Sequence, residues 1–311
     1  MSTVHGIVAY PVTPFRRDTL AVDHDQLAAL IDRLVASGAH AIAPLGSTGE
    51  SAYLTDSEWT DVATTAVGAV AGRVPTVVGI SDLTTAGAVE RARTAQRLGA
   101  DMVMVLPVSY WKLSEAEVRG HVTAIATATD LPIMVYNNPA TSGIDLSPQF
   151  LVDLVETIPT VTMIKESSGD ITRMQRIAQL GGGQIPFFNG SNPLAFHALA
   201  AGASGWCTAA PCLIPQQCLN LYAAMSAGDL TAARESFTPI LPLLEFILSS
   251  GGLPTTVKAG LAELGFDAGI PRPPLQPLDD SGTDRLRGLL AALAVLPTPG
   301  AGKAHELASR S

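Results

Sequence analysis

Short apolar runs alternate with longer amphipathic segments along most of the chain. Eight such runs begin at Gly6, Ala41, Thr76, Met102, Ile133, Thr162, Pro186 and Gly205. Most are rich in Val, Ile, Met and aromatic residues, and their apolar positions are consecutive and do not alternate with polar ones. That pattern is typical of strands buried on both faces of a parallel sheet. The pattern therefore predicts eight parallel strands.

The segments between these runs have apolar residues at three- and four-residue spacing, which predicts amphipathic helices. The clearest are residues 24–38, 86–99, 115–129 and 148–158. Start and stop signals agree, because Gly99 follows one of these segments and Ser147-Pro148 precedes another. Each predicted strand is thus followed by a predicted helix.

Eight β-then-α units favour an α/β fold of the (β/α)8 TIM-barrel class. An open doubly wound sheet is the alternative, but its usual glycine-rich phosphate loop is missing, since "AYPVTPFRRD" follows the first strand. The last ninety or so residues contain no further strand signal, and the segments 230–250, 254–265 and 282–296 each read as helical. We predict that residues 1–212 form the barrel, residues 213–296 a helical C-terminal extension and residues 297–311 a flexible tail.

Composition and charge narrow the class of protein. Of 311 residues, 47% are hydrophobic and only 15% are charged, which is enough apolar material for a large core. The formal net charge of −9 and the lack of any Lys or Arg run argue against nucleic acid as a partner. The N-terminus has no signal-peptide pattern, and no apolar stretch is long enough for a membrane span. We expect a soluble, cytoplasmic protein without a membrane partner.

The cysteines and histidines give no metal-ligand pattern. The three cysteines are odd in number and have no C-x-x-C spacing, so we expect buried, reduced thiols. They are Cys207, Cys212 and Cys218. The six histidines form no H-x-H or H-E-x-x-H motif. We therefore predict neither a metal site nor a cofactor.

The ends of the predicted strands carry polar residues where an apolar chain would be expected. In a parallel barrel the chemistry takes place at the carboxyl ends of the strands and in the loops that follow them. Those ends read "LGSTGES", "PVSYW", "VYNNP", "IKESSGD", "NGSN" and "TAAP", and all six contain hydroxyl, amide or charged groups. We expect the functional site to lie there.

Lys165 interrupts the apolar run "TVTMIKESSGD". One reading is a packed lysine whose ammonium reaches an acid such as Glu166 or Asp170. The other is a desolvated amine, nucleophilic near neutral pH, that forms an imine with a ketone. The strand position and the polar neighbours favour the imine-forming amine.

Tyr136 and the pair Ser47–Thr48 also have two readings each. Tyr136 could be a half-buried strand aromatic with its hydroxyl in water, or a phenol that carries protons beside an imine. Ser47 and Thr48 could be simple turn residues between Gly46 and Gly49. With the backbone N–H groups that these glycines expose, they could instead bind a substrate carboxylate.

Three motifs in the right order give a family resemblance. "GSTGES" after the second strand, "YNNP" at the end of the fifth and "IKESSGD" in the sixth resemble the dihydrodipicolinate synthase/N-acetylneuraminate lyase family. The resemblance extends from about Gly6 to about Gly269. It implies a class I, Schiff-base (β/α)8 barrel, usually a homotetramer, so we expect a homo-oligomer, a tetramer or a dimer. It also implies a small 2-oxo acid or imine as substrate.

The resemblance assigns roles to individual residues. It makes Lys165 the Schiff-base lysine, Tyr136 the proton-shuttling tyrosine, and Ser47 with Thr48 the binders of the carboxylate. Tyr110 resembles a tyrosine that the family places near the active site or across a subunit interface, although Ser109 competes for that place. The remaining substrate-binding candidates are Thr141, Ser167, Asn189, Gly190 and Ser191.

Two departures from the family pattern indicate the substrate branch. Thr141 stands where synthases carry an arginine for the aldehyde substrate's carboxylate. "NGSN" stands where neuraminate lyases favour a "GYDE"-like loop. The remaining motif sequences most resemble Δ1-pyrroline-4-hydroxy-2-carboxylate deaminases and the related 2-keto-3-deoxy sugar acid dehydratases.

The sequence thus predicts a Schiff-base lyase. The deamination of Δ1-pyrroline-4-hydroxy-2-carboxylate to 2,5-dioxopentanoate and ammonia fits the resemblance best. A 2-keto-3-deoxy sugar acid dehydratase and a pyruvate-dependent aldolase are the alternatives within this chemistry. A non-catalytic barrel that binds a keto acid is the alternative from another class.

Overall fold

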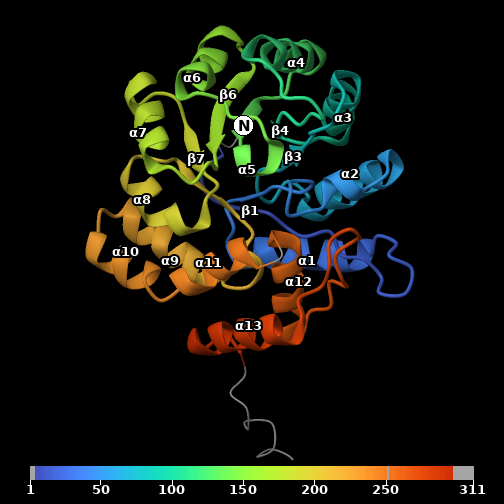
Figure 1. Ribbon diagram of the computed structural model, residues 1–311, viewed down its shortest axis with the longest axis vertical. Coiled ribbons are helices and arrows are strands. Elements are labelled where there is room, and N and C mark those ends of the chain that lie inside the picture. Colours follow the sequence, from blue (N-terminus) through green and yellow to red (C-terminus); the bar gives the residue numbers. More distant parts are fainter. Residues whose placement is uncertain (1–3, 251, 297–311) are drawn as a thin grey trace, which may run out of the picture.

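The computed structural model describes residues 4–250 and 252–296. Eight strands form one parallel sheet: β1 (Gly6–Ala9), β2 (Ala41–Ile42), β3 (Val77–Gly79), β4 (Met102–Val105), β5 (Ile133–Asn137), β6 (Val161–Glu166), β7 (Phe187–Asn189) and β8 (Gly205–Thr208). Their order is β2-β1-β8-β7-β6-β5-β4-β3. A parallel bridge between Ile42 and Thr76 joins the two ends of this order. The sheet is therefore closed, and the predicted TIM barrel is confirmed (Figure 1).

Helices follow the strands and surround the barrel. They are α1 (His24–Ala36), α2 (Asp56–Val70), α3 (Thr85–Leu98), α4 (Glu115–Ala128), a short α5 (Pro139–Ser142), α6 (Pro148–Thr157), α7 (Ile171–Leu180), α8 (Ala195–Ala200) and α9 (Pro215–Ser226). The four helices predicted most clearly are present, and side-chain caps fix where they begin. Ser147 caps α6 by accepting from the Phe150 N–H, and Pro148 opens its first turn.

The barrel strands are almost completely buried. Every residue of β1, β3, β4, β5, β7 and β8 is buried, as expected for a parallel sheet covered by helices. The three cysteines are free and buried, as predicted. Burial raises the pKa of Cys212 to about 12, so this thiol is inert at neutral pH.

The C-terminal extension is helical, as predicted. It consists of α10 (Leu230–Phe237), α11 (Leu241–Ser249), α12 (Leu253–Glu263) and α13 (Asp280–Ala292). In Figure 1 these orange and red helices gather at one side of the barrel. The division at residue 212 stays a prediction, and α9, the helix that follows β8, lies beyond it. The predicted flexible tail, residues 297–311, lies outside the described residues.

One predicted helix is two helices in the structure. Residues 230–250 read as a single helical segment, but α10 ends at Phe237 and α11 begins at Leu241. Pro242 lies in the first turn of α11. A proline fits there because the first N–H groups of a helix have no partner within it, whereas inside one long helix it would remove a hydrogen bond.

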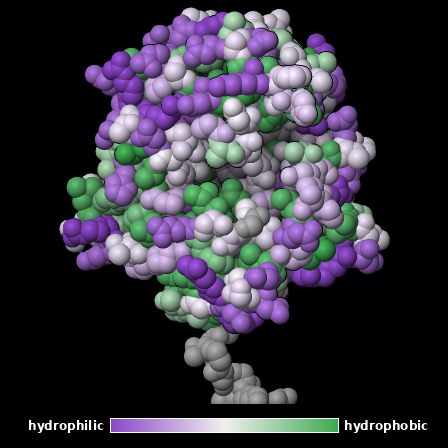
Figure 2. All heavy atoms as spheres, viewed as in Figure 1, coloured by the Kyte–Doolittle hydropathy of each residue, from purple (hydrophilic) through white to green (hydrophobic). Residues whose placement is uncertain are grey.

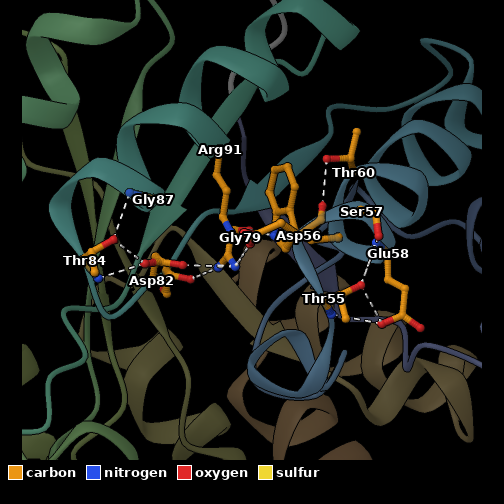
Figure 3. A network of polar contacts seen from close by, with 12 residues as sticks. Thr55, Asp56, Ser57, Glu58, Thr60, Gly79, Asp82, Thr84, Gly87 and Arg91 are labelled. Carbon is orange, nitrogen blue, oxygen red and sulfur yellow. Dashed lines mark hydrogen bonds and ion pairs between the residues drawn. The ribbon is translucent and has the colours of Figure 1, made fainter.

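Two arginines tie the α2 region to its neighbours. Arg91 lies between Asp56 and Asp82, with ion pairs of 3.2 and 3.1 Å (Figure 3). Arg272, which follows α12, donates to Glu58 of α2 at 2.8 Å and to the Leu20 carbonyl at 2.7 Å. The second arginine therefore connects the extension to the barrel.

The Glu58–Arg272 contact predicts an acid-sensitive part of the stability. The hydrogen bond from Arg272 lowers the pKa of Glu58 from 4.5 to about 2. The ionised carboxylate therefore stabilises the fold above pH 4.5, and this contribution is lost as the pH falls toward 2. After allowance for solvent screening, we expect about 1 kcal/mol. Urea unfolding at pH 5.5 and pH 2.5 should show a smaller acid loss in Glu58→Gln than in the wild type, and equal losses would contradict it.

No helix within residues 4–250 and 252–296 has the length and apolar character needed to cross a membrane.

Candidate active site

A cavity of about 340 Å³ lies at the carboxyl ends of the barrel strands. We call it the barrel cavity. Most of its lining side chains carry hydroxyl or amide groups, and Leu248 and Leu253 of the extension close one side. Lys165 is the single charged residue in the lining. In Figure 2, pale residues of intermediate hydropathy surround the middle of the visible face, while the strongly hydrophilic residues lie mainly toward the rim.

Lys165 points into this cavity from β6 and is 5% exposed. Its neighbour in the sheet register is Tyr136 of β5. The Lys165 Nζ lies 3.9 Å from the ring centroid of Tyr136 and 3.9 Å from that of Tyr10. The faces of two aromatic rings therefore take the place that water would have around a surface lysine.

The ion-paired reading of Lys165 is wrong. Within the described residues, no carboxylate lies within 4.0 Å of its Nζ. Glu166 accepts instead from the Asn137 amide at 3.0 Å and lies 3.5 Å from Arg173. Asp170 caps α7 by accepting from the Thr172 N–H. Both acids that sequence reasoning offered as partners are engaged elsewhere.

Tyr136 is more buried than a half-buried strand aromatic with its hydroxyl in water would be. It is only 5% exposed, and its hydroxyl accepts a hydrogen bond from the Asn138 amide at 2.7 Å. The phenol therefore lies inside the barrel cavity beside Lys165, where it can both donate and accept a proton. Asn138 was not predicted, although it follows Tyr136 almost directly in "YNNP".

Ser47 and Thr48 line the cavity from loop 46–50, which follows β2. In the described part of the chain, neither their backbone N–H groups nor their hydroxyls have a hydrogen-bond partner. The loop is held from outside, because the Thr13 hydroxyl donates to the Gly49 carbonyl at 2.7 Å. Two unpaired N–H groups and two hydroxyls at the cavity wall are groups that can bind a carboxylate.

The loop after β7 leaves room for Lys165. A Cβ on Gly190 would lie 1.8 Å from the Ser167 Oγ and 2.8 Å from the Lys165 Cε. Ser167 and Ser191 line the cavity with Gly190. Asn189 does not line it, because its buried amide donates to the Ser191 carbonyl and accepts from the Ser191 N–H. Asn189 therefore stabilises the conformation of this loop and does not contact the cavity.

Of two further predicted site residues, Thr141 lines the barrel cavity and Tyr110 does not. Thr141 lines the barrel cavity from α5, as expected. Tyr110 is 91% exposed and does not line it, and its ring packs edge-on against Trp111, which is also exposed. Within one chain, the tyrosine is thus separate from the other candidates. Its placement across a subunit interface, and the homo-oligomer itself, stay predictions.

Tyr10 and Cys207 are cavity residues that sequence reasoning missed. The Tyr10 hydroxyl donates to the Met104 Sδ at 3.0 Å. Burial raises the pKa of Tyr10 well above its ordinary value, so the phenol keeps its proton. Burial also raises the pKa of Cys207, against the opposing charge of Lys165. Its position in the sequence could have indicated Tyr10, because it directly follows the first strand, much as Tyr136 lies at the end of the fifth strand.

The arrangement suits imine chemistry. A desolvated primary amine, a phenol beside it and a set of free N–H groups provide a nucleophile, a proton carrier and an anion site. Among the described residues, no group of three or more His, Cys, Asp or Glu side chains has the geometry to hold a metal ion.

Known proteins share both the sequence and the fold. A 4-hydroxy-tetrahydrodipicolinate synthase of Methanoculleus marisnigri is 35% identical over 92% of this chain and 98% of its own. A candidate dihydrodipicolinate synthetase from Pseudomonas aeruginosa has a crystal structure with a TM-score of 0.92 and 53% identity, over 94% of this chain and 100% of that one. The dihydrodipicolinate synthase of Aquifex aeolicus has a TM-score of 0.90 at 28% identity, over 95% and 100%.

The family model described as "Dihydrodipicolinate synthetase family" matches residues 3–293, which is nearly the whole chain. The solved structures among these matches agree with the fold described above, a barrel followed by C-terminal helices. The protein is therefore an enzyme of the dihydrodipicolinate synthetase family, whose members are class I, Schiff-base lyases.

Proposed function

We propose that the protein deaminates Δ1-pyrroline-4-hydroxy-2-carboxylate to 2,5-dioxopentanoate and ammonia. The observation that carries this proposal is the charge of the barrel cavity. Its lining contains one cation, Lys165, and no arginine, and Thr141 stands where a second carboxylate clamp would be needed. Such a cavity suits a substrate with one carboxylate and a hydroxyl group.

Binding fixes the substrate for attack. The free N–H groups and hydroxyls of Ser47 and Thr48 hold the carboxylate, which places C2 near the Lys165 amine. The hydroxyls of Ser167, Ser191 and Thr141 are available to the C4 hydroxyl of the substrate.

The first covalent step opens the ring. The Lys165 Nζ, once uncharged, forms a bond to C2, and the bond from C2 to the ring nitrogen breaks. The ring nitrogen takes up a proton and becomes a primary amine on C5. The lysine is then joined to C2 as a protonated imine, for which the faces of Tyr10 and Tyr136 provide a cation site.

The protonated imine acidifies C3 and permits elimination. Tyr136 exchanges a proton with C3, and the C4 hydroxyl leaves as water after it accepts a proton. A proton shift from C5 to C3, then one to C4, converts the C5 amine to an imine. Hydrolysis at C5 releases ammonia, and hydrolysis at C2 frees Lys165 and the 2-oxo group. One water leaves and two are consumed, so the net reaction takes up one water.

A second candidate is the synthase reaction of the curated relatives, which are named 4-hydroxy-tetrahydrodipicolinate synthases at 30–35% identity. This reaction would join pyruvate, as its lysine imine, to a carboxylated aldehyde. The same Lys165 would serve, but the second carboxylate would need a partner other than an arginine of the cavity lining.

The test incubates the purified enzyme with each candidate substrate separately and measures the products. We expect one ammonia per 2,5-dioxopentanoate from the pyrroline, and no product from pyruvate with aspartate 4-semialdehyde. The Tyr136→Phe variant tests the proton carrier. It keeps the ring but lacks the hydroxyl, so its turnover should be about a hundredfold lower than that of the wild type. Two results would refute the proposed substrate if no ammonia is released from the pyrroline. One is dehydration of a 2-keto-3-deoxy sugar acid, and the other is condensation of pyruvate with aspartate 4-semialdehyde. No reaction in any of these mixtures would favour the non-catalytic alternative.

A further inference from the structure

Glu50 ends loop 46–50 in an unusual conformation. Its φ of 54° and ψ of 31° lie in the left-handed region, and the residue is only 1% exposed. Residues other than glycine adopt this region rarely, and they persist there only where the surrounding structure holds them. The contacts of Glu50 therefore contribute, with the Thr13–Gly49 hydrogen bond, to fixing the path of the loop that carries Ser47 and Thr48.

The Glu50 carboxylate is held by the C-terminal extension. The Lys258 Nζ of α12 lies 2.6 Å from its Oε1, and the Arg272 backbone N–H donates to its Oε2 at 2.8 Å. Lys258 also donates to the Ile270 carbonyl at 3.1 Å and lies 3.9 Å from the centroid of the Phe15 ring. Both charged side chains are almost fully buried, at 1% and 0% exposure.

Within the described residues, Lys258 is the only cation that Glu50 pairs with. The guanidinium of Arg272 is engaged by Glu58 and by the Leu20 carbonyl. Burial lowers the pKa of Lys258 to about 8, and the Glu50 carboxylate opposes that shift, so the lysine is charged at pH 7. The two residues thus form a matched, buried ion pair.

This pair joins two walls of the barrel cavity. Glu50 follows Ser47 and Thr48 in the same loop, and Lys258 lies on the helix whose first residue, Leu253, also lines the cavity. Buried ion pairs contribute little net stability compared with apolar packing, and their better-attested role is to fix one arrangement of the chain. Here the arrangement that is fixed includes the anion site.

We propose that the Glu50–Lys258 ion pair is a positioning device, which holds loop 46–50 against α12 so that the N–H groups of Ser47 and Thr48 converge on the substrate carboxylate. This inference rests on the proposed carboxylate-binding role of that loop. Neither Lys258 nor Glu50 lines the barrel cavity, so the pair acts through the geometry of the loop.

The experiment uses two ketones that differ only at the carboxylate. Pyruvate and acetone are trapped on the enzyme with borohydride at pH 7, and the half-saturating concentration and maximal trapping rate are measured for each. Lys258→Met should raise the half-saturating pyruvate concentration about tenfold and leave that of acetone within about twofold. The maximal trapping rates should change less than about threefold, because Lys165 itself is undisturbed.

Two further variants separate positioning from stability. Thr255→Val, on the same helix, removes a hydrogen bond to the Gln276 carbonyl, in which no residue of loop 46–50 takes part. It should lower the melting temperature without changing the pyruvate-to-acetone ratio. The double variant Glu50→Gln/Lys258→Met leaves no uncompensated charge, so it should regain thermal stability relative to Lys258→Met while its pyruvate affinity stays weak.

Several outcomes would overturn the inference. One is an unchanged half-saturating pyruvate concentration in Lys258→Met, and another is an equal rise of this concentration for pyruvate and acetone. A similar change of the pyruvate-to-acetone ratio in Thr255→Val, or full recovery of pyruvate affinity in the double variant, would also contradict it. Failure of the Schiff-base function is distinguishable, because the wild-type protein would then form no adduct with either ketone, and this inference would fall with it.

Discussion

We expect the Lys165→Met variant to form no borohydride-stable adduct with pyruvate and to lose turnover by about 10³-fold or more. The amine is the one nucleophile in the lining that can form an imine, and neither Tyr10 nor Tyr136 can replace it. Peptide mass mapping of the trapped wild-type protein should place the adduct on Lys165. Lys112→Met is the matched control, because Lys112 is exposed and does not line the barrel cavity.

The same variant should be at least as stable as the wild type. The buried ammonium of Lys165 has no carboxylate partner within the described residues, and its contacts are two ring faces and the Met104 Sδ at 4.0 Å. Each such contact contributes about 0.5–2 kcal/mol, whereas the effective penalty for burying an ion is several kcal/mol. Methionine fills a similar volume without that penalty. We expect the free energy of unfolding to rise by about 1 kcal/mol.

The result distinguishes function from packing. A lysine kept for structure would cost stability when replaced and would leave turnover unchanged, whereas a nucleophile shows the reverse pattern. Retained turnover in Lys165→Met, or an adduct that maps to another lysine, would contradict the assignment of Lys165.

The fold was predictable because its signal is local. The strands of the barrel are buried on both faces and mostly apolar, so the eight runs stand out without knowledge of their neighbours. The break between α10 and α11 was missed because the apolar spacing continues across it. There Pro242, which fits a first turn but not a helix interior, decides the outcome.

The candidate site was predictable only where a motif ends a strand. Lys165, Tyr136, Ser47 and Thr48 meet in one cavity because the carboxyl ends of all parallel strands lie on the same face of the barrel. Lys258 gave no such signal. Its role depends on the packing of α12 against loop 46–50, about two hundred residues earlier in the chain, and no local pattern encodes that contact.

The Gly190→Ala variant should inactivate the enzyme without unfolding it. The added Cβ would lie 1.8 Å from the Ser167 Oγ and 2.8 Å from the Lys165 Cε, which are both flexible side-chain atoms. The backbone can therefore stay in place while the serine rotates and the lysine moves away from the substrate carbon. Displacement of a reacting atom by about 1 Å can cost about a hundredfold in rate, so we expect turnover to fall by that factor or more.

Gly68→Ala is the matched control for this substitution. Gly68 lies in α2, where an added methyl group would meet nothing within 4 Å, and alanine should stabilise that helix by about 0.5–1 kcal/mol. Steady-state turnover and borohydride trapping with pyruvate would be measured for both variants, with thermal unfolding as the check on folding. Normal trapping in Gly190→Ala would show that the cavity has room for the methyl group, and that Gly190 does not set the position of the nucleophile.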